Sequence, residues 1–247
     1  MFNKPSFYHQ KFYHQRIRYS FSWNYKHHIN KISILNPRLY EFKKLERYFE
    51  RILNDKYAKN MNNIFNSKQY PRVSQFKISG LKSAFIKSFS KKLIQTKKIK
   101  KLNSESNLSK YAQAVYENFI KEKKNIPGHD PILKYILIRD KDSIAKEVPI
   151  WKKIQNTYLT GHIDLIQIEN DTIKVIDYKP EGNFLLSLPQ VAMYGVLIRS
   201  KFNFNKVKCI SFNKENAWEY DPDILNAEIK EYLISQHIKE RPWERFI

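Results

Sequence analysis

The sequence predicts an α/β protein, in which helices flank a mixed central β-sheet and a basic, mainly helical region comes first. Three observations lead to this prediction. Apolar runs with the length of β-strands occur between residues 144 and 212. Segments with helical periodicity precede, interrupt and follow those runs. Charge is also divided unevenly, because residues 1–105 carry 24 Lys and Arg against 5 Asp and Glu, whereas residues 106–247 carry 21 against 19.

This asymmetry predicts two parts with different roles. Residues 1–105 are expected to be a basic, aromatic-rich, mainly helical nucleic-acid-binding region, and residues 106–247 a folded core. The net charge of +21 indicates a polyanionic partner, and 42% hydrophobic residues suffice for a sizeable core. A membrane-surface or structural-interaction role driven by the basic region is the less favoured reading of the same charge.

The N-terminal part contains two helical patterns and one duplication. Apolar residues at spacings of three and four predict a helix over 37–66, and a second amphipathic segment covers 74–100. Residues 101–107 are the best linker candidate. The sequence Phe-Tyr-His-Gln occurs at 7–10 and again at 12–15. It is either part of a flexible arm or a surface on which unpaired bases stack.

The second part has a compact order of elements. We expect a helix over 108–124, a helix or strand over 130–140, and a strand over 144–150. Two apolar runs, 158–168 and 172–179, then form a hairpin. A helix over 188–200, a strand over 207–212 and a helix over about 223–238 complete the core. These elements form a mixed sheet with helices around it.

The hairpin brings two acids together. If Asn170 and Asp171 are the central residues of a tight turn, the numbers of each cross-strand pair sum to 341. Asp164 then faces Asp177, with Cβ atoms about 4.5–5.5 Å apart. Like charges in that position destabilise a sheet, and a divalent cation bound by carboxylate oxygens would offset their repulsion. Lys179 lies on the same face as Asp177, two residues further on. The pattern predicts a site for metal-assisted hydrolysis.

The same residues carry a resemblance to a known family. Gly161-x-x-Asp164, Asp177-x-Lys179 after an apolar strand, and Gln190-x-x-x-Tyr194 in the next helix resemble the PD-(D/E)XK nuclease superfamily, in particular its RecB-type branch. The likeness covers about residues 108–215. It implies a restriction-endonuclease-like core and a metal-dependent deoxyribonuclease. In this branch, which includes exonucleases, single-stranded or free-ended DNA is the favoured substrate.

The resemblance also implies roles for single residues. Asp164 and Asp177 match the metal-binding acids, and the backbone carbonyl of Tyr178 would complete the coordination of Mg²⁺ or Mn²⁺. Lys179 matches the lysine that orients or deprotonates the attacking water, and a nearby cation would depress its pKa. Gln190 and Tyr194 match an auxiliary motif near the substrate.

Other positions have competing interpretations. Ser187-x-x-Gln190 also reads as a helix capping box, and Tyr194 could simply be core. Many members of the branch carry a His in the first helix of the core, where this chain has Tyr116 and Glu117. Glu117 is either a replacement metal ligand or an exposed helical residue.

Three further residues are weaker candidates. Glu147 matches an acid often present in the branch, and together with His162 it is a candidate for substrate contact. His129 is a further weak candidate.

Composition excludes several classes of protein. The lone Cys209 excludes an internal disulfide framework and a four-cysteine zinc or iron–sulfur site. The chain has no apolar stretch of about 18 residues, the length of a membrane span, and no apolar leader followed by a cleavage site. We therefore expect an intracellular, cytoplasmic protein without membrane contact. Organelle import is an alternative, because residues 1–40 contain no acid.

The favoured function is therefore a Mg²⁺- or Mn²⁺-dependent DNA nuclease. The alternative is a nucleic-acid-binding protein that keeps the fold without catalysis. Repair, host defence, replication and mobile-element roles all remain open at this stage.

Overall fold

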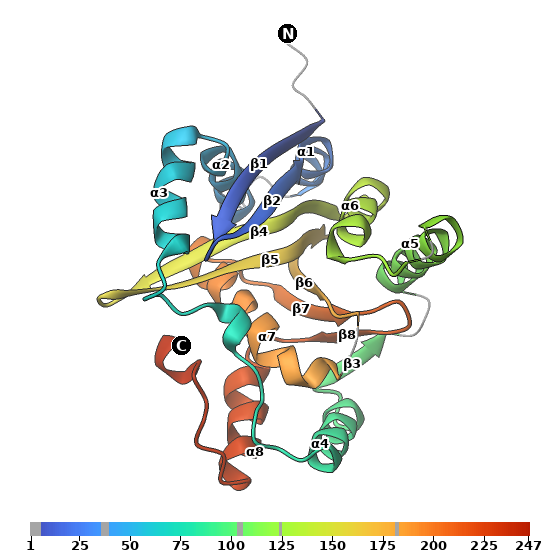
Figure 1. Ribbon diagram of the computed structural model, residues 1–247, viewed down its shortest axis with the longest axis vertical. Helices are drawn as coiled ribbons and strands as arrows, with labels where there is room; N and C mark the ends of the chain where they lie inside the picture. The colour runs from blue at the N-terminus through green and yellow to red at the C-terminus, as the bar shows by residue number, and fades with distance from the viewer. Residues whose placement is uncertain (1–5, 36–39, 103–105, 124, 181–182) are drawn as a thin grey trace.

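The structure is a computed structural model that describes residues 6–35, 40–102, 106–123, 125–180 and 183–247. In these residues one eight-stranded sheet has the order β1-β2-β4-β5-β6-β7-β8-β3 (Figure 1). All neighbouring strands are antiparallel except β6 and β7, which are parallel. The protein is therefore a mixed α/β fold, as the sequence predicts.

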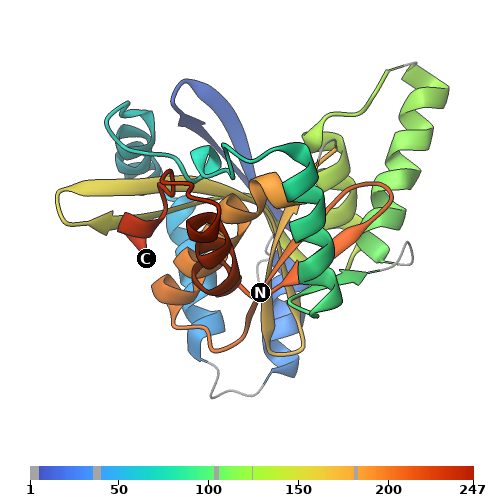
Figure 2. The same cartoon turned by 90° about the horizontal axis from the view of Figure 1, so that it is seen from below.

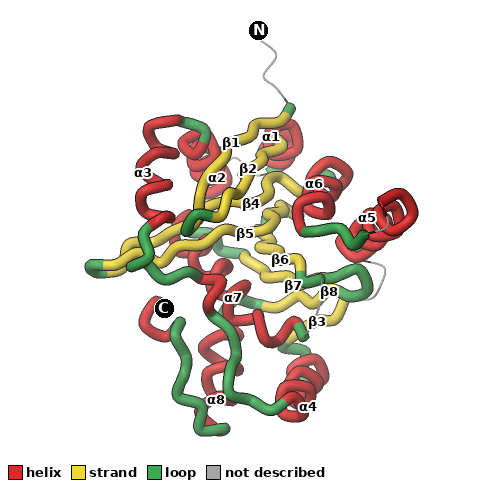
Figure 3. Tube along the Cα trace, viewed as in Figure 1, coloured by secondary structure: helices red, strands yellow, loops and turns green. Residues whose placement is uncertain are grey.

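The strands form one continuous band, and the helices lie around it (Figure 3). The strands are β1 Phe7–His14, β2 Ile17–Asn24, β3 Ile99–Leu102, β4 Ser143–Ile154, β5 Thr157–Glu169, β6 Thr172–Tyr178, β7 Val207–Phe212 and β8 Ala217–Tyr220. The α-helices are α1 Tyr25–Ile34, α2 Tyr40–Ile52, α3 Asp55–Asn66, α4 Ser83–Gln95, α5 Asn107–Lys123, α6 His129–Arg139, α7 Phe184–Phe202 and α8 Lys230–Ser235. The shorter turns are 3₁₀-helices η1 Val73–Gln75 and η3 Glu244–Phe246, with a π-helical stretch, η2 Leu225–Ile229, before α8.

The N-terminal part is built into the same sheet as the rest of the chain. The β1–β2 hairpin extends one edge of the sheet through β4, and β3 pairs with β8 at the other edge. The division at residue 105 therefore does not separate two sheets or two cores. The prediction of a mainly helical region did not include β1, β2 and β3. Short basic segments show little of the alternation that identifies a strand.

The duplication in the first strand is explained by strand geometry. Successive side chains of a strand point to opposite faces, so an offset of five residues places the two copies on opposite faces. Phe12 and His14 of the second copy are buried in the core. His9 of the first copy is exposed, and Phe7 lies on the same face. The segment is thus an ordered hairpin and not a flexible arm.

Two apolar clusters cover the two faces of the sheet. α5 and α6 contribute Val115, Ile132 and Ile136 to one cluster, together with Leu165 and Ile176 of the sheet. α7 belongs to the other, larger cluster, which also includes side chains of α2, α4 and the β1–β2 hairpin. Figure 2 shows α5 at the edge of the molecule, far from α8. The central strands, covered on both faces, account for the near-continuous apolar runs in the sequence.

Most predicted elements are present, with shifted boundaries. The helix expected over 37–66 is broken after Ile52, where Asn54 caps α3 by accepting a hydrogen bond from the Tyr57 backbone N–H. The segment 74–100 contains η1, α4 and the start of β3. The linker 101–107 falls partly outside the described residues, between β3 and α5. No helix in the described ranges is long and apolar enough to cross a membrane.

Candidate active site

The predicted hairpin register is confirmed. Glu169 pairs with Thr172, and the ladder continues to Leu165 and Ile176, so the residue numbers of each pair in the ladder sum to 341. Asn170 takes a positive φ of 53°, as tight hairpin turns require at their first central position. Asp164 and Asp177 occupy the next position, just beyond the end of this ladder. They are therefore held at the point where β5 and β6 begin to separate.

A third acid lies at the same level of the sheet. Lys146 pairs with Leu165 and Val148 pairs with Ile163, so Glu147 stands opposite Asp164. Glu147 itself has a φ of +50°, and no ladder pair forms at this position. The acids of β4, β5 and β6 are consequently abreast across three neighbouring strands.

Asp177 is held by the lysine and the glutamine that the sequence associates with it. The Lys179 Nζ atom is 2.7 Å from Asp177 Oδ2, as an ion pair. Gln190 Nε2 donates to Asp177 Oδ1 at 3.3 Å, and Gln190 Oε1 accepts from Lys179 Nζ at 3.5 Å. The Asp177 side chain is 2% exposed and that of Lys179 is 22% exposed. The amine is therefore the part of this group that reaches toward solvent.

Asp164 is held from two directions. Its Oδ2 accepts a hydrogen bond from the Tyr178 backbone N–H at 3.0 Å. The same oxygen is 3.5 Å from Nδ1 of His129, at the first position of α6. The His129 side chain is 44% exposed, so it borders the open side of the site. A histidine thus does reach the carboxylates, but from α6 and not from the first helix of the core.

The close carboxylates perturb each other's ionisation. Burial, followed by the negative charge of Asp164, raises the pKa of Asp177 to about 7, although Lys179 opposes the rise. Burial alone would raise the pKa of Asp164, but the hydrogen bond and charge of His129 outweigh it and lower that pKa. Burial would lower the pKa of Lys179, but Asp177 and Asp164 raise it above its ordinary value. The amine is thereby kept charged beside the carboxylates.

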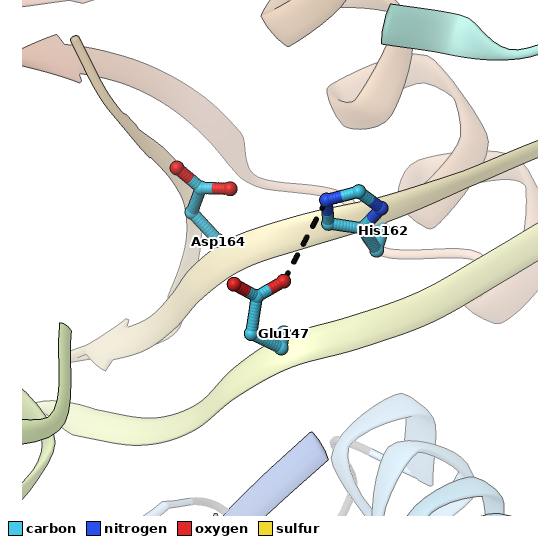
Figure 4. Close-up of side chains that lie close together, drawn as sticks. All are labelled: Glu147, His162 and Asp164. Carbon is cyan, nitrogen blue, oxygen red and sulfur yellow. Dashed lines mark ion pairs between the residues drawn. The ribbon is translucent and has the colours of Figure 1, made fainter. Parts of the chain in front are cut away.

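A second group shares Asp164. One ligand atom each from Glu147, His162 and Asp164 lies within 4.8 Å of the others, which is a separation that one metal ion can span. Figure 4 shows the Glu147 and His162 side chains on neighbouring strands, joined at 3.6 Å between Oε2 and Nε2, with Asp164 beside them. Glu147 Oε2 is buried without a hydrogen-bond partner among the described residues. Buried acceptors without a donor are costly, so these residues fit a cation.

The helix that carries Gln190 starts earlier than expected. α7 begins at Phe184, and Asn183 caps it by accepting a hydrogen bond from the Leu185 backbone N–H. The reading of Ser187 and Gln190 as a capping box is therefore wrong. Ser187 lies inside the helix and donates to the Phe184 carbonyl, while Gln190 is free to bind Asp177.

Tyr194 packs beneath the site. It is buried, and a Cβ atom built on Gly161 would lie 2.4 Å from its Cε1 atom. Position 161 therefore accommodates only a glycine, because the Tyr194 ring occupies the space that a Cβ atom would need. This geometry supports a packing role for Tyr194 and not contact with a substrate.

The structure does not bring Glu117 to the site. Glu117 is exposed on α5 and accepts a hydrogen bond from Gln113 one turn earlier at 2.8 Å. Its carboxylate is not part of the metal-capable group. This position agrees with the interpretation of Glu117 as an exposed helical residue. Glu147 and His162, the candidates for substrate contact, are only 11% and 12% exposed and lie close to Asp164.

Sequence reasoning missed the pairing of Glu147 with Asp164. The signal was available, because Gln155 and Asn156 form another two-residue connection, with Ile154 pairing with Thr157. In that hairpin the residue numbers of the pairs near the site sum to 311, which places Glu147 opposite Asp164. No protein-family model matches this sequence, and no curated protein matches it either.

Proposed function

We propose that this protein is a metal-dependent DNA nuclease of the PD-(D/E)XK type, close to the RecB-type branch. One observation carries the proposal: a charged amine, Lys179, stands 2.7 Å from a buried aspartate whose neighbour across the hairpin is a second buried aspartate. Two acids and a lysine in this arrangement suit phosphodiester hydrolysis with a divalent cation.

The order of elements around the site also supports the proposal. The acids come from β5 and β6, and α7 leads from β6 to the parallel strand β7. Gln190 of α7 then reaches back to Asp177. This is the sequence of parts that a restriction-endonuclease-like core would need, although here the sheet is larger and mostly antiparallel.

The chain's own groups have distinct tasks in this proposal. Asp164 and Asp177, with the Tyr178 carbonyl, would hold Mg²⁺ or Mn²⁺. The cation would neutralise charge at the scissile phosphate and lower the pKa of a water molecule. Lys179 stabilises negative charge that develops on the phosphate oxygens, and Gln190 keeps the amine and Asp177 in register. Water adds to phosphorus, the P–O bond to the leaving strand breaks, and the leaving oxygen takes a proton.

The exposed face of the β1–β2 hairpin is a candidate surface for the substrate. The cross-strand pairs His9–Ser22, Lys11–Ser20 and Tyr13–Arg18 place cations and rings on one face. Tyr13 is 45% exposed, and Lys11 and Arg18 are exposed as well. Cations beside exposed rings suit the phosphates and unstacked bases of a single strand. We therefore favour single-stranded or free-ended DNA as the substrate.

The test is cleavage by two variants of the full chain, Asp177→Asn and Lys179→Met. We expect each to lose at least about a hundredfold in cleavage of end-labelled single-stranded DNA with Mg²⁺ or Mn²⁺, since each removes a group that acts in the transition state. Affinity for the same DNA in EDTA should change less than about threefold, because neither residue lies on the hairpin face.

Two results would reject the nuclease proposal. One is full activity in both variants. The other is binding of DNA by the unaltered protein without cleavage of single-stranded, duplex or circular DNA in either metal, which would favour a non-catalytic nucleic-acid-binding protein. Binding to anionic lipid vesicles without binding to DNA would instead favour a membrane-surface role.

A further inference from the structure

The group of Glu147, His162 and Asp164 has a different ligand chemistry from the two aspartates. It combines two carboxylates with one imidazole, and its ligand atoms lie within 4.8 Å of each other. His162 and Asp164 are two residues apart on β5, so their side chains share one face. Glu147 comes from β4 (Figure 4). Asp177, whose two oxygens contact Lys179 and Gln190, is not a member of this group.

The backbone of Glu147 is adapted to this arrangement. Its φ of +50° lies in the left-handed region, which is unfavourable for a residue with a Cβ atom. The β4–β5 ladder has pairs on both sides of Glu147, at Lys146 and at Val148, but none at Glu147 itself. Local backbone strain of this kind persists where the surrounding structure enforces it, and it is common at functional sites.

One carboxylate oxygen of the group lacks a hydrogen-bond partner among the described residues. Glu147 is 9% exposed, and its Oε2 has no hydrogen-bond donor among the described residues. This oxygen is 3.6 Å from His162 Nε2, which is beyond hydrogen-bond range.

The orientation of the imidazole is fixed by its neighbours. The Tyr19 ring lies 4.0 Å from the His162 ring, centroid to centroid, and the His14 ring meets it edge-on at 5.8 Å. His14 is itself held by Thr160, whose Oγ1 is 3.0 Å from His14 Nε2. These rings pack around the imidazole, whose Nε2 is 3.6 Å from Glu147 Oε2.

We propose that Glu147, His162 and Asp164 form a cation site of their own, which takes a first-row transition-metal dication such as Mn²⁺ in preference to Mg²⁺. Mg²⁺ prefers oxygen ligands in a near-ideal octahedron and retains its waters, whereas imidazole nitrogen suits transition metals better. Two carboxylates and a neutral imidazole offset the two charges of the ion. This site lies beside the two aspartates of the proposed nuclease and shares Asp164 with them.

The test measures metal binding by the full chain without DNA. Free Mn²⁺ is counted by its electron paramagnetic resonance signal in titrations of the unaltered protein, His162→Asn and Glu147→Gln, with Mg²⁺ as competitor. We expect either substitution to weaken one class of Mn²⁺ sites at least about tenfold and to change Mg²⁺ affinity less than about threefold. Asp177→Asn should retain that class. His237→Asn, the same exchange at an exposed histidine, is the matched control.

A second variant protects the test against misfolding. His162→Asp keeps a ligand but replaces nitrogen by oxygen, so the preference should shift toward Mg²⁺ in a protein that still binds metal. Unchanged Mn²⁺ affinity in His162→Asn would overturn the proposal, and so would an equal loss of Mg²⁺ and Mn²⁺ affinity in that variant. Loss of all Mn²⁺ binding in Asp177→Asn would also overturn it. Absence of DNA cleavage alongside intact Mn²⁺ binding would reject the nuclease and leave this site standing.

Discussion

At the scale of single residues, the site depends on acids that burial keeps close together. Asp164, Asp177 and Glu147 stand abreast on three strands, where their negative charges oppose one another. Lys179 and His129 each neutralise one of them in part. Glu147 Oε2 has no hydrogen-bond partner in the described part of the chain, which is why this carboxylate is the strongest indication that an ion belongs here.

The raised pKa of Asp177 predicts a pH dependence for metal binding. Burial and the charge of Asp164 raise this pKa to about 7, so below that pH the acid is protonated and a cation must displace the proton. Cation affinity should therefore rise as pH increases from about 6 to about 8 and then level off. Calorimetric titration in buffers of different ionisation enthalpy measures both the affinity and the released proton. Affinity that is flat across this range would contradict the prediction.

Gly161 provides a residue-scale test of packing under the site. A Cβ atom at this position would lie 2.4 Å from the Tyr194 ring, so Gly161→Ala should destabilise the fold by about 1–3 kcal/mol. Chemical denaturation measures the loss. In the background of Tyr194→Leu, which removes the ring, the same substitution should cost clearly less. Additive costs of the two changes would show that the ring and the glycine are not in contact.

At the scale of elements, the β1–β2 hairpin has two faces with different tasks. Phe12, Phe21 and Trp23 face the core and attach the hairpin to the molecule. The opposite face presents Lys11, Tyr13 and Arg18, and the hairpin contains no acid. The alternation of the strand thus lets one segment serve both the core and a polyanionic partner.

Charge reversal on the hairpin tests its role in binding. Lys11→Glu with Arg18→Glu should weaken affinity for a single-stranded oligonucleotide at least about tenfold. It should also reduce the salt slope by about 0.7 for each phosphate contact that is lost. Fluorescence anisotropy at several salt concentrations measures both. Lys87→Glu with Lys91→Glu on α4 makes the same charge change far from the hairpin (Figure 1). Equal losses in the two double variants would assign binding to net charge alone.

At the scale of the whole molecule, one sheet and its two apolar clusters unite the basic part with the rest. The larger cluster contains residues from α2, α4 and the hairpin as well as from α7 and the central strands. The basic region therefore contributes to the same hydrophobic core as the central strands.

This organisation predicts that residues 106–247 do not fold alone. Without the earlier residues, this fragment loses the cover of Phe21, Trp23, Phe42 and Phe49, and each buried aromatic contributes about 1.5–3 kcal/mol. The full chain should unfold in one cooperative transition, whereas the fragment should show none in circular dichroism during heating. A fragment with its own sharp transition would restore the division into two folding units.

The sequence by itself determined the features that depend on neighbours along the chain. A two-residue turn and a strict period of two were enough to place Asp164 across from Asp177 and to put Lys179 beside it. The apolar runs identified the central strands, because both of their faces are covered. The motif also pointed to Gln190, which donates a hydrogen bond to Asp177. The competing capping box is absent, because Asn183 caps α7.

Only the tertiary structure decided which distant groups complete the site. His129 reaches Asp164 from α6, Glu147 turns to it through a backbone conformation that its sequence does not signal, and Tyr19 fixes the His162 ring from the hairpin. The physical reason is that periodicity encodes which face a side chain takes on its own element. How separate elements meet depends on how their apolar faces pack, and that is a property of the whole chain.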